Sequence, residues 1–259
     1  GYPGWHIECS CISMKNLGEY LDLHCGGIDN QFPHHTNEIA QSEAYLGHKW
    51  CNYWFHVHHL NTNSGKMSKS KGEFLTVSLL ESKGYDPLVY RFFCLQSHYR
   101  KSLVFTYENL DNAKRAFEKL AASVAAAKKT ASGEPDAAKF AELKAGFDAA
   151  LGNDLNTSLA ITALYDVLKS DADGATKIAL INDFDKVLSL DLVKKADALI
   201  EAEKAAESDV PAEIQALVDQ RREARKAKNF ALADELRDKI SELGWVVEET
   251  RQGTKIYKK

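Results

Sequence analysis

The 259-residue sequence has few cysteines and no long apolar run. Its five cysteines are odd in number and lie in the first hundred residues, unlike the paired cysteines of a secreted disulfide framework. No apolar stretch approaches the roughly 20 residues that cross a bilayer, and the N-terminus lacks a signal-peptide pattern. We therefore expect a soluble, cytoplasmic protein without a membrane partner, whose thiols are reduced or bound to a metal.

A strong excess of basic charge is also lacking. The net charge is -4, and residues 211–259 carry a small surplus, with 11 Lys and Arg against 9 Asp and Glu. Because contacts to phosphate come from Lys and Arg, the composition alone does not indicate nucleic-acid binding. The contents of 44% hydrophobic and 27% charged residues are near globular averages and exclude wholesale disorder.

The first 105 residues predict an α/β layer, because short β-type runs alternate with helical stretches. The expected strands and helix are Trp5 to Ser10, Tyr20 to His24, Trp54 to Leu60, and Asn37 to Leu46. The chain begins with Gly1 rather than Met, and the first expected strand has no lead-in. We therefore expect that a segment upstream of this chain is missing.

The remaining residues predict two helical regions. Thr106 is a candidate N-cap of a long amphipathic helix, and about four helices are expected in residues 106–206, in a small bundle. Residues 207–259 predict a linker, two helices over about 212–228 and 230–243, and a terminal hairpin formed by Trp245 to Val247 and Thr254 to Tyr257. The predicted domains are therefore residues 1–105, 106–206 and 207–259.

Cys9, His34 and Glu38 form the first candidate site. His34 and Glu38 are one helical turn apart, so both side chains can face one metal ion, and Cys9 can approach from a neighbouring strand. A tetrahedral site needs one ligand more than these three. The spacing alone favours the alternative, a polar helix start beside a buried cysteine.

Two further segments have weaker signals. In the run from His24 to Asp29, adjacent glycines allow a tight turn at which backbone N–H groups approach a phosphate, but a purely structural turn has the same pattern. Strand alternation places Trp54, His56 and His58 on one face. Partly exposed hairpin histidines explain this second pattern better than a metal site, because no carboxylate or cysteine falls at matching spacing.

Residues 65–72, GKMSKSKG, follow a cluster of turn formers and predict an exposed loop. Lys66 and Lys69, together with two serine hydroxyls, suit the stabilisation of charge on a polyphosphate during transfer. A solvated basic loop is the alternative interpretation. The position of the string after a glycine turn and a Cys, His and Glu set favours the functional interpretation.

Basic residues gather near the end of the first C-terminal helix, and Phe230 and Asp234 open the next helix. The basic set comprises Arg221, Arg222, Arg225, Lys226 and Lys228. Basic side chains bind phosphates and an exposed aromatic stacks on an unpaired base. Taken by themselves, however, these residues favour a solvated helix face with Phe230 in the core.

Taken together, these segments resemble the cysteinyl-tRNA synthetase family of class I aminoacyl-tRNA synthetases, nearly from end to end. The resemblance is carried by GWHIECS at residues 4–10, FPHHTNEIAQSEA at 32–44, GKMSKSKG at 65–72 and KNFALADELRDKISELG at 228–244. It implies the C-terminal part of a Rossmann-type catalytic domain, a helical bundle (DALR-like) and a small anticodon-binding module.

The resemblance also implies an activity, cysteine–tRNA ligation. ATP, with Mg²⁺, would activate cysteine to cysteinyl-adenylate, from which the aminoacyl group would pass to tRNA(Cys). Zn²⁺ held by Cys9, His34, Glu38 and an upstream cysteine would bind the substrate thiolate. A soft thiolate binds zinc far better than a serine hydroxyl, which accounts for selection without editing.

Roles for further residues follow from the same resemblance. Trp5 and Asp29 correspond to the pocket for the amino acid, and His24, Gly27 and Asp29 to positions near the adenylate. Lys66 and Lys69 correspond to the catalytic loop that closes on the ATP phosphates. Arg225, Phe230 and Asp234 correspond to contacts with the tRNA anticodon.

Two departures from the family pattern affect the expected activity. Glu73 occupies a position where the family usually has Asn, which places a negative charge near the phosphate-binding loop. The N-terminal half of the catalytic domain, with its HIGH signature and first zinc-binding cysteine, is absent, so we expect no catalysis by this chain alone. The alternatives are a stand-alone tRNA-binding module, a related ligase that joins cysteine to a sugar amine, and a zinc hydrolase.

Overall fold

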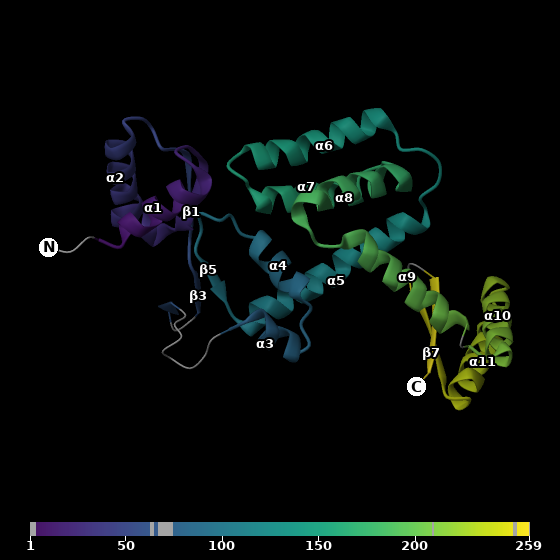
Figure 1. Cartoon of the computed structure of the whole chain (residues 1–259). Coiled ribbons are helices and arrows are strands. Elements are labelled where there is room, and N and C mark those ends of the chain that lie inside the picture. The colour runs from purple at the N-terminus through teal and green to yellow at the C-terminus, as the bar shows by residue number, and fades with distance from the viewer. Residues whose placement is uncertain (1–3, 63–64, 67–74, 209, 251–252, 259) are drawn as a thin grey trace. The chain divides into compact units, whose positions relative to one another are not determined.

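A computed structural model describes residues 4–62, 65–66, 75–208, 210–250 and 253–258 (Figure 1). The chain forms two compact units, Gly1–Leu192 and Val193–Lys259, and each is described by itself. Among the described residues, no helix is both long and apolar enough to span a membrane.

The first unit begins with a βαβ arrangement. Strands β1 (Leu21–Gly27) and β2 (Cys51–Val57) are parallel, with Leu21 opposite Cys51 and Gly27 opposite Val57. Between them lie the 3₁₀ turn η1 (Ile28–Asn30), the π-helical turn η2 (Gln31–His35) and helix α2 (Thr36–Leu46). A small core of Leu21, Trp50 and Cys51 joins this arrangement to helix α1 (His6–Leu17), which packs on α2.

The prediction of a strand from Trp5 to Ser10 is wrong, because these residues lead into and begin helix α1. The error came from the alternation of apolar Trp5, Ile7 and Cys9 with polar residues, which imitates a strand. In the structure the less exposed positions of α1 follow a helical period. Ser10 is buried, and its hydroxyl accepts a hydrogen bond from the Ser42 hydroxyl of α2 at 3.0 Å. Ile7 and Ile12 are exposed.

The expected strand from Trp54 to Leu60 is interrupted. Strand β2 ends at Val57, and the short β3 (Leu60–Thr62) belongs to another sheet, in which it pairs antiparallel with β4 (Gly65–Lys66) and parallel with β5 (Leu103–Phe105). His58 therefore lies outside the strand that carries Trp54 and His56. Helices α3 (Val77–Ser82) and α4 (Pro87–Leu95) lie between β4 and β5 in the sequence.

Five helices occupy the described residues from 107 to 208, against the four expected. They are α5 (Tyr107–Lys129), α6 (Ala137–Gly152), α7 (Thr157–Lys169), α8 (Gly174–Leu188) and α9 (Leu192–Ser208). The predicted start of α5 is confirmed, since the Thr106 hydroxyl accepts a hydrogen bond from the Asn109 N–H at 3.0 Å. Helices α6, α7 and α8 lie side by side (Figure 1), and the rings of Phe147 and Phe184 stack at 3.9 Å.

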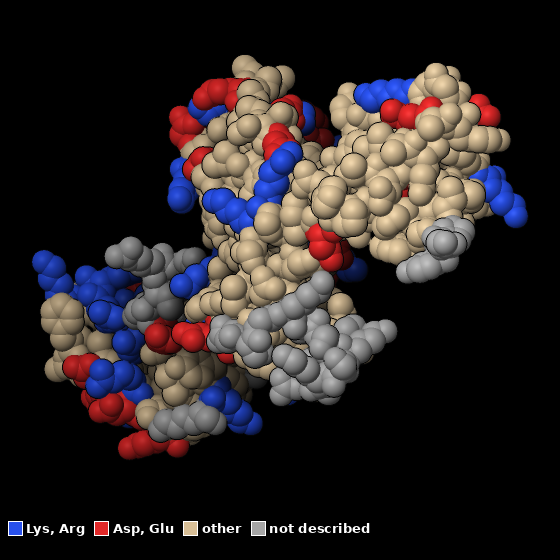
Figure 2. Space-filling model, turned by 90° about the vertical axis from the view of Figure 1, so that its left-hand side faces the viewer, with Lys and Arg blue, Asp and Glu red and all other residues tan. Residues whose placement is uncertain are grey.

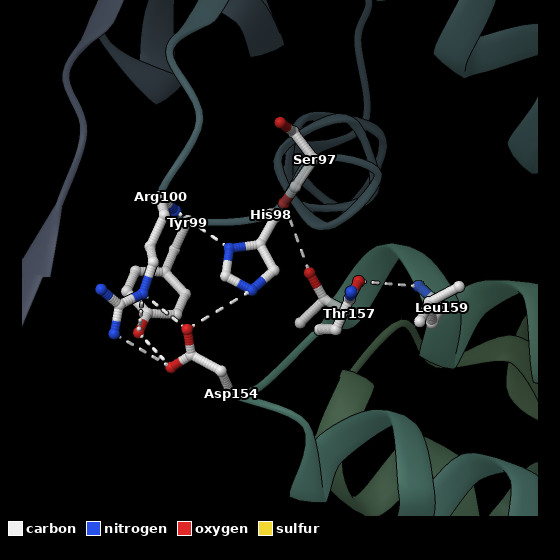
Figure 3. Close-up of polar contacts among 8 residues, drawn as sticks. Ser97, His98, Tyr99, Arg100, Asp154, Thr157 and Leu159 are labelled. Carbon is white, nitrogen blue, oxygen red and sulfur yellow. Dashed lines mark hydrogen bonds and ion pairs between the residues drawn. The ribbon is translucent and has the colours of Figure 1, made fainter.

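Polar contacts join this bundle to the loop between α4 and β5 (Figure 3). Asp154, in the turn between α6 and α7, accepts hydrogen bonds from Arg100 Nε and the Tyr99 hydroxyl, each at 2.5 Å. The Tyr99 ring stacks on Phe55 of β2 at 4.1 Å, and its carbonyl accepts a hydrogen bond from the His58 N–H. Tyr99 thus contacts both β2 and the bundle.

The second unit contains the two predicted helices and the predicted hairpin. Helices α10 (Ala212–Lys226) and α11 (Phe230–Glu242) pack together, and β6 (Trp245–Thr250) pairs antiparallel with β7 (Gly253–Lys258). Ile214, Val218 and Ile240 form its buried core, against which Trp245 and Ile256 pack. Gly244, between α11 and β6, has a φ of 82°, which only glycine adopts readily.

Candidate metal centre and active site

The structure brings Cys9, His34 and Glu38 together from three elements. Cys9 lies on α1, His34 on η2 and Glu38 in the first turn of α2, and their candidate ligand atoms all lie within 4.8 Å of one another. His34 and Glu38 are buried, and Glu38 has no exposed surface. Cys9 approaches from a helix, not from the strand that the sequence predicted.

The electrostatics of this cluster suit a cation. A fully buried carboxylate is costly unless it is paired, and Glu38 Oε1 receives no hydrogen bond from the described residues, although His34 Nε2 lies 2.5 Å away. Burial lowers the pKa of His34, which favours the neutral imidazole that a metal binds. Thiolate, imidazole and carboxylate together form a donor set that fits Zn²⁺.

In the absence of a cation, the surroundings of Cys9 favour the protonated thiol and not the thiolate that a metal binds. Burial, and then the negative charges of Glu38 and Glu8, raise the pKa of Cys9 above its ordinary value. A bound cation would reverse this effect, because metal ligation requires the thiolate and releases its proton. Metal binding at this cluster is therefore expected to weaken as the pH falls.

Further histidines surround the cluster. His6 Nδ1 lies 2.6 Å from His34 Nδ1, and His35 Nδ1 lies 2.8 Å from His56 Nε2. A second group with candidate ligand atoms within 4.8 Å comprises His24, His35 and Glu38. Burial lowers the pKa of His35 to about 4 and also lowers that of His56, so both are neutral near pH 7.

Sequence reasoning missed His6, His35 and His56 as neighbours of the site. The adjacent pair His34 and His35 was a signal, because consecutive residues of a turn entering a helix can each reach a different group. A second signal was the alternation that places Trp54 and His56 on one face of β2. The contact of His56 with His35, however, could be found only from the fold. His58 faces a separate pocket of about 360 Å³ lined also by Phe55, Tyr90 and Cys94.

Trp5 and His24 contact the same cluster, whereas Gly27 and Asp29 lie beside each other and His59. The Trp5 ring stacks on His34 at 3.6 Å with an interplanar angle of 12°, although more than half of its surface is exposed. His24 Nε2 lies 2.6 Å from Glu38 Oε2. Asp29 Oδ1 lies 3.2 Å from His59 Nε2, and a side chain at Gly27 would collide with Asp29 Oδ1 at 2.5 Å.

Gly26, the residue before Gly27 in β1, lies very close to the His35 ring. A Cβ at Gly26 would lie 2.6 Å from His35 Cε1 and 3.1 Å from Asn30 Nδ2. Both distances are shorter than ordinary carbon contacts, so the backbone of β1 approaches His35 as closely as a missing side chain allows.

The lysine-rich loop lies largely outside the described residues. Lys69 is among the residues that the structure does not describe, as is Glu73. The backbone of Lys66 lies in β4 opposite Asn61, which places the start of the loop at the end of the β3–β4 hairpin, but its side chain is not described.

Arg225, Phe230 and Asp234 lie in the second unit. Phe230 begins α11 with 60% of its surface exposed, so the alternative in which it belongs to the core does not hold. Asp234 is one helical turn further and lies 3.4 Å from Arg237 Nη1. Arg225 is in the last turn of α10, whereas Arg221, which the sequence grouped with it, is buried.

Comparison with known proteins identifies the class. Residues 1–115 match the family model described as the class I (C) tRNA synthetase catalytic domain, and residues 207–256 match the cysteinyl-tRNA ligase anticodon-binding domain. A crystal structure of the ternary complex of Agrobacterium radiobacter K84 agnB2 LeuRS with tRNA and LeuAMS has a similar fold, with a TM-score of 0.51 at 13% identity over 69% of this chain and 27% of that chain. The chain thus contains part of a class I tRNA synthetase catalytic domain and a helical C-terminal region.

The relatives make the identification more specific. Cysteine–tRNA ligase 1 of Burkholderia lata is 41% identical, over 99% of this chain and 52% of the relative, and cysteine–tRNA ligase of Caldicellulosiruptor saccharolyticus is 40% identical, over 99% and 57%. The chain belongs to the cysteine–tRNA ligase family. It spans about half the length of the curated relatives that it matches.

Proposed function

We propose that this chain supplies the metal-binding part of the catalytic domain and the anticodon-binding module of a cysteine–tRNA ligase. The reaction would use ATP, with Mg²⁺, to convert cysteine to cysteinyl-adenylate and would transfer the aminoacyl group to tRNA(Cys). The observation that carries the proposal is the cluster of Cys9, His34 and Glu38 within a segment that matches a class I synthetase catalytic domain. The match of residues 207–256 to an anticodon-binding domain disfavours a ligase that acts on a sugar amine.

Cys9, His34 and Glu38 would hold Zn²⁺, with a fourth protein ligand from outside this chain. When bound, the ion supplies a soft Lewis acid that prefers the thiolate of cysteine to the hydroxyl of serine. His34 would bind as a neutral imidazole, a form that burial already favours. Its stacking on Trp5 and its contact with His6 would fix the plane of the ring.

The remaining roles concern binding and positioning. Trp5 and Asp29 would line the pocket for the cysteine substrate, and His24, Gly27 and Asp29 would lie near the adenylate. Lys69, assisted by Lys66, would stabilise the phosphates of ATP during transfer. In support, Trp5 and His24 contact members of the Cys9, His34 and Glu38 cluster directly.

We further propose the finer architecture: residues 1–105 as the C-terminal part of a Rossmann-type catalytic domain, 106–206 as a DALR-like bundle and 207–259 as the anticodon module. The parallel pairing of β1 with β2 through η1, η2 and α2 supports the first assignment. The core shared by α10, α11 and the hairpin supports the third.

The βαβ arrangement has a bare surface on which a further segment would dock. Among the described residues β1 pairs only with β2, and the register partners Leu23 and Tyr53 are 54% and 71% exposed. Broad areas of the face shown in Figure 2 carry no Lys, Arg, Asp or Glu. Because parallel sheets are normally covered on both faces, we propose that the part of the ligase beyond this chain covers this surface.

Aminoacylation assays test the catalytic proposal. The isolated chain is expected to be inactive, and activity is expected on addition of the N-terminal half of a relative such as the Burkholderia lata ligase. Hydrogen exchange of the β1 amides is expected to slow on that addition, because a new strand would satisfy them. Activity of the isolated chain would contradict the need for a partner segment.

The anticodon assignment requires a separate binding assay. Replacing Phe230 with Ala is expected to weaken binding of tRNA(Cys) by roughly 5- to 100-fold, if its ring stacks on one base. Tyr257→Ala is the matched control, because Tyr257 is another exposed aromatic of the same unit. Equal affinities for the two variants would rule out Phe230 as a stacking residue.

A further inference from the structure

Both carboxylate oxygens of Glu38 face histidines. Oε1 lies 2.5 Å from His34 Nε2, and Oε2 lies 2.6 Å from His24 Nε2. The second contact has the length of a hydrogen bond, which a glutamate carboxylate accepts when Nε2 is the ring nitrogen of His24 that bears the hydrogen. That contact lies on the side of Glu38 away from Oε1, the oxygen that approaches His34.

The ring of His24 is held firmly in the orientation that makes this contact. His24 is on β1, directly opposite Trp54 of β2. The rings of Trp54 and Trp50 meet the imidazole edge to face, with centroids at 4.8 Å and 5.8 Å. Trp50 is 1% exposed and therefore cannot move aside easily.

We propose that His24 is a positioning residue for Glu38. Its hydrogen bond would occupy Oε2, so that Oε1 alone is presented to an ion bound by Cys9 and His34. This inference rests on the proposed function, because it requires these three residues to be metal ligands. It adds to that function a role for His24 that involves no contact with the ion.

A second metal ion is the competing explanation, because His24, His35 and Glu38 also have candidate ligand atoms within 4.8 Å of one another. Hydrogen bonding explains the contacts of these residues better. A second ion would have to share Glu38 with the first, and its group of candidate ligands contains no thiolate. His35 Nδ1 is already within 2.8 Å of His56 Nε2.

Cobalt and zinc binding to the full chain test the proposal. Co²⁺ titration, followed by the thiolate-to-cobalt charge-transfer absorption, measures binding at Cys9, and competition with a chromophoric chelator gives the Zn²⁺ affinity. The decisive pair is His24→Gln, whose amide reaches the position of Nε2, and His24→Asn, whose amide falls short. His48→Leu is the control, because His48 stacks on Tyr20 away from the cluster.

The wild-type chain is expected to bind one equivalent of Co²⁺ with a charge-transfer band that Cys9→Ser abolishes. His24→Asn is expected to weaken Zn²⁺ binding by about 10- to 100-fold and to change the cobalt spectrum, since loss of an outer partner loosens the ligand. His24→Gln should restore most of the affinity, and His48→Leu should have no effect. Circular dichroism checks that each variant is folded.

Three results would overturn the inference. Equal Zn²⁺ affinities of wild type and a folded His24→Asn overturn it alone and leave the metal site intact. Two equivalents of Co²⁺ in the wild type, with one lost in both His24→Asn and His35→Gln, would make His24 a ligand. Absence of a band that depends on Cys9 would reject the metal site itself, and this inference with it.

Discussion

The βαβ arrangement and the bundle of helices α5 to α8 belong to one unit but are packed in different ways. The bundle has a continuous core in which Leu164, Leu180 and Phe184 are fully buried. The βαβ arrangement has a core of three buried residues, and it exposes large apolar side chains such as Leu17, Leu23 and Tyr53. Its other fully enclosed groups are polar, among them Glu38 and Ser42.

This difference separates the large apolar core of the chain from its candidate site. Burial of apolar side chains stabilises the bundle directly. In the βαβ arrangement many of the buried groups are instead polar: a carboxylate, imidazoles and hydroxyls. The region that holds the candidate site therefore has a small apolar core of its own. We expect variants in the two regions to respond differently to the same kind of truncation.

The largest expected effect is the removal of a core aromatic from the bundle. Phe184→Ala is expected to lower the free energy of unfolding by about 3–5 kcal/mol, because the ring stacks on Phe147 and leaves a cavity. Chemical denaturation followed by circular dichroism measures the loss. Tyr53→Ala, the matched change on exposed β2, should cost less than about 1 kcal/mol.

Tyr53 also offers a way to sharpen the comparison. If the N-terminal half of a relative covers β1 and β2, the free-energy cost of Tyr53→Ala should rise when that half is added. A cost equal to that of Phe184→Ala in the isolated chain would contradict the description of this surface as bare.

A smaller effect is expected at the start of the helical region. Thr106→Ala removes the hydroxyl that caps α5 and should destabilise the first unit by about 1 kcal/mol. Thr106→Ser keeps the hydroxyl and serves as the control. If the two variants unfold at the same denaturant concentration, the cap does not contribute to stability.

The smallest expected effect concerns an ion pair on the bundle surface. Lys144 and Lys186 hold Asp183 at 2.8 Å and 2.9 Å, and the hydrogen bond from Lys144 is the main reason that the pKa of this carboxyl lies below its ordinary 3.8. Asp183→Asn should cost less than about 1 kcal/mol at neutral pH.

The pH dependence of this effect has a defined sign. Because the folded-state pKa is lowered, the stabilisation is present above pH 3.8 and is lost as the pH falls through the lower folded-state value. The difference between wild type and Asp183→Asn, measured by denaturation at several pH values, should therefore shrink in acid. A difference that grows in acid would contradict this assignment.

Local signals predicted the bundle and the C-terminal unit well. The cap at Thr106, the buried positions Leu110 and Phe117, and the hairpin that begins at Trp245 follow from periodicity and turn chemistry, which depend on a few neighbouring residues. The βαβ region was harder to predict, because α1 has an alternating apolar pattern.

The candidate metal site was also predictable only in part, but for a different reason from the fold of the βαβ region. His34 and Glu38 were found because they are one turn apart, Cys9 was added as a thiol that could approach from a neighbouring element, and the family resemblance favoured the set. His6 meets His34, and His35 meets His56, only after α1 packs on α2 and β1 pairs with β2. Such contacts depend on tertiary structure and have no signature at short range.

Gly26 shows that the dependence on tertiary structure also determines which substitutions the chain tolerates. It carries no functional group, yet an added methyl group would lie 2.6 Å from the imidazole of His35. In a selection for a working ligase, Gly26→Ala should therefore behave like a lesion of the histidine cluster, whereas Gly146→Ala should pass unnoticed because nothing lies within 4 Å of its added carbon. A fitness assay of Gly26→Ala would thus show how close the His35 imidazole lies to β1, although Gly26 itself has no side chain.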